Sequence, residues 1–137
     1  MGIYTEFHFN VELINDIPSD VLKILEYMIS RDNDKYDNVD KLQLPDHPFF
    51  TNSKRWVWML HSDSYYFSAD THSTLRQDDS PYNITRYLCI RCNLKNYCNE
   101  IENFVDWINP YVKADKGDFL GFSRYEESED PEIIRKK

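Results

Sequence analysis

Residues 64–97, SYYFSADTHSTLRQDDSPYNITRYLCIRCNLKNY, have the pattern of two β-strands joined by a polar turn. Side chains alternate between the two faces of a strand, so each strand presents two different surfaces. The apolar face of the second strand comprises Leu88, Ile90, Cys92 and Leu94, and its other face comprises Tyr87, Cys89, Arg91 and Asn93. In the first strand, one face comprises Tyr66, Ser68, Asp70 and His72. The pattern predicts a sheet with one core face and one polar face.

Residues 3–13 show the clearest alternation in the chain, and they predict a strand that belongs to the same sheet. Its apolar positions are Ile3, Thr5, Phe7, Phe9, Val11 and Leu13. Its polar positions are Tyr4, Glu6, His8, Asn10 and Glu12. We therefore expect Glu6 and His8 to join the polar face of the sheet.

Two amphipathic helices are predicted, each with one apolar stripe at helical spacing. The first follows Pro18, which suits the first turn of a helix, and its stripe comprises Val21, Leu22, Leu25, Met28 and Ile29. The second ends before Pro110, and its stripe comprises Tyr97, Ile101, Phe104, Val105 and Ile108. Each stripe has the width expected of a surface that packs on a core.

The rest of the chain predicts a long loop over residues 31–54, pinned to the core by Phe49 and Phe50, and two further strands. Residues 55–63 have apolar side chains in both parities, which is typical of a strand covered on both sides. Residues 119–127 form the last predicted strand, and residues 128–137 a frayed tail. The element order is then β-α-β-β-β-α-β.

This order predicts an α+β fold in a single domain over residues 1–137. We expect a two-layer sandwich, in which a mostly antiparallel sheet of about five strands carries two helices on one face. The polar face of the sheet would be the exposed one.

Charge and targeting signals limit the classes of function. The net charge of −8 argues against non-specific nucleic-acid binding, which depends on Lys and Arg, but it permits binding to a basic surface of another protein. The sequence shows neither a signal peptide nor a stretch long enough to cross a membrane. Three cysteines, an odd number, fit reduced thiols. We therefore expect a cytoplasmic protein without disulfides.

No motif argues for catalysis or for a bound cofactor. The three glycines, at positions 2, 117 and 121, exclude the usual phosphate-cradling loops. Cys89 and Cys92 are three residues apart in a strand and so point to opposite faces, which prevents them from chelating one metal ion. A metal or acid–base site on His8, His72 and Asp70, with Glu6 nearby, is the alternative, although no paired spacing supports it.

The polar face is the candidate binding surface. Arg91 and Arg124 bring forked cations into an acidic protein, and either could hold an anion. The candidate ligand-binding residues are Arg91, Arg124, His72, His8, Tyr66, Asp70 and Asn93. This set suits a small, anionic, nucleotide-like ligand. The competing interpretation is internal pairing, in which the two arginines satisfy Glu6, Asp70 or Glu126.

Four segments together resemble a family of small bacterial proteins of the phage and prophage type. They are YTEFHFNVEL (4–13), SYYFSADTHSTL (64–75), LCIRCNLKNYCNEIENFVDWINPY (88–111) and GDFLGFSRYEESEDP (117–131). The resemblance implies a context rather than an activity: an accessory protein in a bacterial host cell. By association, the resemblance implies a role against host defence, either by sequestering a nucleotide signal or by blocking a host protein.

The sequence thus predicts a non-catalytic binding protein, with a small enzyme as the alternative. A third expectation concerns assembly. Aromatic side chains on an exposed sheet face mark interfaces, so Tyr4, Tyr66 and Tyr87, together with Trp58, predict a symmetric homodimer.

Overall fold

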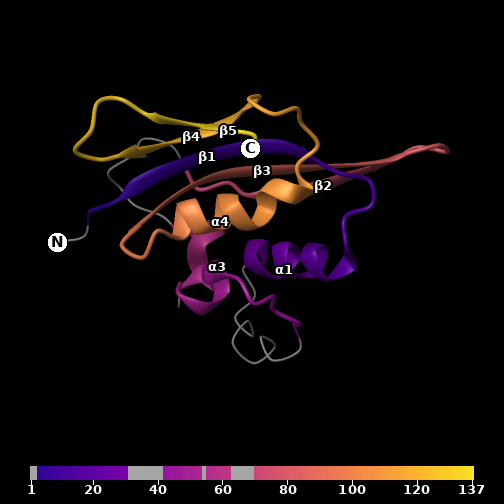
Figure 1. Cartoon of the computed structure of the whole chain (residues 1–137), viewed down its shortest axis with the longest axis horizontal. Helices are drawn as coiled ribbons and strands as arrows, with labels where there is room; N and C mark the ends of the chain where they lie inside the picture. Colours follow the sequence, from indigo (N-terminus) through magenta and orange to yellow (C-terminus); the bar gives the residue numbers. More distant parts are fainter. Residues whose placement is uncertain (1–2, 31–41, 54, 63–69) are drawn as a thin grey trace.

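The computed structural model describes residues 3–30, 42–53, 55–62 and 70–137. Five strands form one antiparallel sheet in the order β2-β3-β1-β4-β5. The strands are β1 (Thr5–Leu13), β2 (Thr74–Asp79), β3 (Ile84–Leu94), β4 (Phe119–Tyr125) and β5 (Glu132–Arg135). The helices lie together on one side of this sheet, and the β2–β3 hairpin projects beyond them (Figure 1). The predicted α+β sandwich with an antiparallel sheet is confirmed.

The register of β1 confirms the predicted faces. Phe7 lies opposite Cys92 and Phe9 opposite Ile90, so the apolar positions of the two strands share one face. That face carries the core, and nine of the residues that the two stripes and the strands place there are almost fully buried. They are Phe7, Phe9, Leu25, Met28, Leu88, Ile90, Ile101, Phe104 and Ile108, each 2% exposed or less.

Helix α1 (Ser19–Ile29) and helix α4 (Glu100–Ile108) supply the other side of the core. Pro18 is the N-cap residue of α1, directly before the first helical residue, Ser19. Helix α3 (Pro48–Thr51) packs on α4, and its Phe49 is fully buried. The rings of Phe49 and Trp107 stack with centroids 5.9 Å apart. The described end of the long loop therefore packs on the helical layer, away from the polar face of the sheet.

Residues 55–63 do not form the predicted strand. Trp56–His61 form η2, a 3₁₀ helix. Within it Trp56, Val57, Met59 and Leu60 are buried, while Trp58 is 37% exposed. This spacing of i, i+1, i+3 and i+4 fits a helical turn with one exposed side, and a run that is apolar in both parities does not distinguish it from a covered strand.

The chain also departs from the prediction near residue 97 and at its end. Helix α4 begins only at Glu100, after Asn99 with φ 56°, which leaves Tyr97 outside the helix and exposed. The tail is not frayed throughout, because Glu132–Arg135 pair with β4 as strand β5. Most of the strand predicted before Thr74 falls on residues 63–69, outside the described residues.

Ile90→Ala should lower the free energy of unfolding by about 2–5 kcal/mol, because it empties a packed site that is 1% exposed. Ile84→Ala is the matched control in the same strand, where the isoleucine is 42% exposed. It should cost less than about 1 kcal/mol. Equilibrium denaturation of both variants measures the difference. Equal losses would contradict the burial of Ile90 in the core, since both isoleucines lie on the same face of β3 and differ in exposure.

Candidate functional site

The polar face of the sheet carries a row of side chains that crosses four neighbouring chain segments. In the register, His8 lies opposite Arg91 on one side and Phe122 on the other. His72 extends the row, because its backbone N–H donates to the carbonyl of Arg91 at 2.7 Å and its own carbonyl accepts from the N–H of Arg91 at 3.0 Å. We call His72, Arg91, His8 and Phe122 the central row. The row brings three of the predicted ligand-binding residues side by side.

Arg91 is the exposed cation of the central row. Its Nε donates to the backbone carbonyl of Asp70 at 2.7 Å, which fixes the plane of the guanidinium. Within the part of the chain that the structure describes, no carboxylate forms an ion pair with Arg91. Its two terminal nitrogens therefore remain available to an anion. Asp70 contributes through its backbone carbonyl to this arrangement.

Arg124 has a different role. Its Nη2 lies 2.8 Å from Oε2 of Glu6, its cross-strand neighbour in β1. Glu6 is the less exposed partner, with 12% of its side chain accessible against 41% for Arg124. A carboxylate that is largely removed from water needs a cation or several hydrogen-bond donors. Arg124 is therefore paired internally with Glu6. It is not an unpaired cation available to a ligand, as the first interpretation of the sequence had it.

His8 lies in β1, between the strands that carry these two arginines, and its ring contacts Phe122 and Glu6. Its ring stacks on Phe122, with centroids 4.5 Å apart and an interplanar angle of 13°. Its Nε2 lies 3.4 Å from Oε1 of Glu6. Burial lowers the pKa of His8 and Arg91 adds to this effect, against the opposing influence of Glu6. His8 is therefore a mainly neutral ring at neutral pH.

A glycine brings β4 close to β1 at this row. A Cβ atom at Gly121 would collide with the backbone carbonyl oxygen of His8. The absence of a side chain thus permits the approach that sets Phe122, the next residue, against the imidazole of His8.

Asn93 lies on the same face but is only 2% exposed. It is the cross-strand neighbour of Glu6, and its backbone N–H donates to Ser62 at 3.2 Å. Its Oδ1 is buried and accepts no hydrogen bond from the described residues. Asn93 is therefore a buried member of the face rather than a surface contact. Tyr66, the remaining predicted ligand residue, lies outside the described residues.

The histidines are not arranged to share a metal ion. Arg91 lies between His8 and His72, so the two rings start from strands separated by two sheet spacings, roughly 10 Å. Among residues 3–30, 42–53, 55–62 and 70–137, no group of three His, Cys, Asp or Glu side chains could hold a metal ion. Cys92 is buried in the core, and burial raises the pKa of its thiol, whereas Cys89 lies on the other face.

The structure also contains a concavity that the sequence patterns did not indicate. It has a volume of about 370 Å³ and lies where β1 begins and β4 ends. Its lining comes from segments far apart in the sequence, including residues 3–5, 96–102 and 123–132. No periodicity or local motif joins such segments. Only exposed aromatic residues such as Tyr97 and Tyr125 could have indicated it.

Comparison of the chain with protein-family models, with curated proteins and with solved structures finds no match. The resemblance to a phage-type family therefore remains a prediction. Within the described part of the chain, no helix has the length and apolar composition needed to cross a membrane.

The depressed pKa of His8 should make stability depend on pH in a defined direction. The unfolded chain binds a proton near pH 6.5, whereas the folded protein binds it only at lower pH. The contribution of neutral His8 to the free energy of unfolding is therefore lost as the pH falls below about 6.5. We expect the free energy of unfolding to drop more between pH 7.5 and 5.5 in the wild type than in His8→Gln. Parallel pH profiles from denaturant titrations would contradict the assigned environment of His8.

Proposed function

We propose that this protein is a non-catalytic binding protein that holds an anionic, nucleotide-like ligand on the central row. The observation that carries the proposal is the state of Arg91. Its guanidinium is oriented by a backbone carbonyl at 2.7 Å, and it makes no carboxylate pair with any residue that the structure describes. A planar guanidinium with two open terminal nitrogens matches the geometry of a phosphate or carboxylate group.

The neighbours of Arg91 support this use of the surface. His72, exposed beside it, can donate a hydrogen bond to the same anion. On the other side, the stacked rings of His8 and Phe122 form a rigid aromatic surface next to the cation. Ile133 lies opposite Phe122 and is 48% exposed, which extends the apolar area to the edge of the sheet. Charge and apolar surface lie side by side, as they do in a nucleotide.

The biological part of the proposal comes from the resemblance. A phage-type accessory protein in the bacterial cytoplasm would use this face to sequester a nucleotide signal of host defence. Blocking a host protein is the second form of the same role. The enzymatic alternative on His8, His72 and Asp70 has less support, because Arg91 separates the two histidines.

Arg91→Ala should weaken ligand capture by at least about tenfold, or about 1.4 kcal/mol, and leave the melting curve near native. Native mass spectrometry of the protein recovered from bacterial lysate identifies the retained ligand, and titration calorimetry measures its affinity. Inorganic phosphate and adenosine mono-, di- and triphosphate serve as the first defined probes.

Arg76→Ala is the matched control. Arg76 is an exposed arginine of β2 that pairs with Asp78 at 3.3 Å and lies over the ring of Tyr87. Its loss changes the net charge equally but should leave binding within about twofold of the wild type. An Arg91→Ala protein that melts much earlier yet binds normally would assign Arg91 to structure instead.

We extend the proposal to a symmetric homodimer formed at the β5 edge of the polar face, beside the central row. Trp58 belongs to η2 and Tyr66 is outside the described residues, so the apolar centre passes to Ile133, which is 48% exposed. Light scattering at high micromolar concentration should give twice the mass of one chain, and Ile133→Glu should shift it toward one chain. A wild-type mass of one chain under these conditions would refute the dimer.

A further inference from the structure

We propose that the concavity at the start of β1 binds a lysine or arginine side chain of a basic partner protein. We call it the acidic groove, and its lining comprises Ile3, Thr5, Asn96, Tyr97, Glu102, Ser123, Tyr125, Ser128, Asp130 and Glu132. This site is separate from the central row and does not depend on the function proposed for that row.

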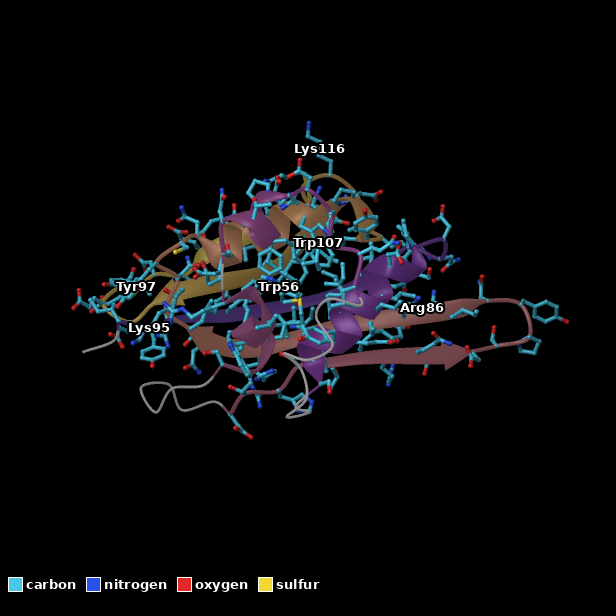
Figure 2. All side chains as sticks on the ribbon, turned by 90° about the horizontal axis from the view of Figure 1, so that it is seen from below. Trp56, Arg86, Lys95, Tyr97, Trp107 and Lys116 are labelled. Carbon is cyan, nitrogen blue, oxygen red and sulfur yellow. The ribbon has the colours of Figure 1, made fainter. Side chains whose placement is uncertain are left out.

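The acidic groove lies on the helical side of the sheet, at one end. Thr5 pairs with Tyr125, and Ser123 pairs with Phe7. These side chains therefore lie on the core face of the sheet and not on its polar face. Asn96 and Tyr97, from the segment between β3 and α4, also line the groove. Figure 2 shows Tyr97 at the end of the molecule opposite the hairpin that carries Arg86.

The charge of the lining has one sign. Glu102, Asp130 and Glu132 are its ionisable acids, and no Lys, Arg or His is among its residues. None of these three carboxylates forms an ion pair within the described ranges. Such a site repels anions and attracts a cation.

The carboxylate of Glu102 is oriented by a neutral amide and not by a cation. Its two carboxylate oxygens accept from Nδ2 of Asn96 at 3.1 and 2.9 Å. Oδ1 of Asn96 in turn accepts from the backbone N–H of Ile101 at 2.9 Å, within the first turn of α4. A neutral amide therefore orients the carboxylate, and the negative charge remains available for a ligand.

Two tyrosine rings complete the surface. Tyr97 is 58% exposed, and its hydroxyl accepts from the backbone N–H of Ile3 at 3.2 Å, which anchors the ring. Tyr125 is 39% exposed. Aromatic faces beside carboxylates favour guanidinium and ammonium groups. Burial raises the pKa of Tyr125, and the negative charges of Glu127 and Glu126 add to this effect.

The size and the charge of the site together indicate the occupant. A volume of about 370 Å³ accepts a long side chain but not a folded element. The net charge of −8 favours approach of a basic protein surface, from which a lysine or arginine can extend into the acidic groove.

The test compares two triple variants with the same net charge. The groove variant carries Glu102→Gln, Asp130→Asn and Glu132→Gln. The control variant carries Glu26→Gln, Asp78→Asn and Asp79→Asn, all at exposed residues outside the lining. The probe is a fluorescein-labelled peptide of alternating glycine and arginine, and its binding is measured by fluorescence anisotropy in about 0.15 M salt.

The groove variant should bind the peptide at least about tenfold more weakly than the wild type, and the control variant within about twofold. Tyr97→Leu, which changes no charge, should also weaken binding several-fold. Equal losses in both triple variants would show a net-charge effect and overturn the proposal, as would wild-type affinity in the groove variant. Spermidine that binds as tightly as the peptide would overturn the assignment to a partner protein. Thermal melts confirm that each variant is folded.

Discussion

The alternation of side chains in β1 is the constraint on which the rest of the structure depends. This strand is central in the sheet, with β3 on one side and β4 on the other. Its odd positions place Phe7 and Phe9 in the core, and its even positions place Glu6 and His8 on the open face. A register shift of one residue would bury the charges and expose the phenylalanines. Because both neighbours are registered against β1, the core and the central row are set by the same pairing.

The two arginines of the open face show how neighbours decide the use of a side chain. Both lie in strands that pair with β1, and both point away from the helices. The cross-strand neighbour of Arg124 is Glu6, and the resulting ion pair satisfies a carboxylate that is mostly removed from water. The neighbours of Arg91 are His8 and His72, neither of which neutralises a cation. An offset of two residues along β1, from Glu6 to His8, thus separates a structural arginine from one open to a ligand.

The two sites that we propose have opposite charge preference and lie on opposite sides of the sheet. The central row presents a guanidinium on the open face, whereas the acidic groove presents carboxylates on the helical side. In an acidic protein, an unpaired cation favours binding of an anion, and Arg91 has no carboxylate partner among the described residues. At the acidic groove, the carboxylates and the net negative charge of the protein attract a basic partner. The two forms of binding therefore do not compete for one surface.

The strands β1 and β3, the helices α1 and α4 and most of their core-facing residues followed from the sequence. Their periodicities of 2 and 3.6 are local properties of the chain. The face on which His8, His72 and Arg91 lie followed from the same alternation. The pairing of Arg124 with Glu6 and the adjacency of His8 to Phe122 depend on the register, which joins residues more than a hundred positions apart. The 3₁₀ helix η2 and the strand β5 also required tertiary context. An apolar run fits either conformation, and a short charged tail becomes a strand only when β4 offers it a free edge.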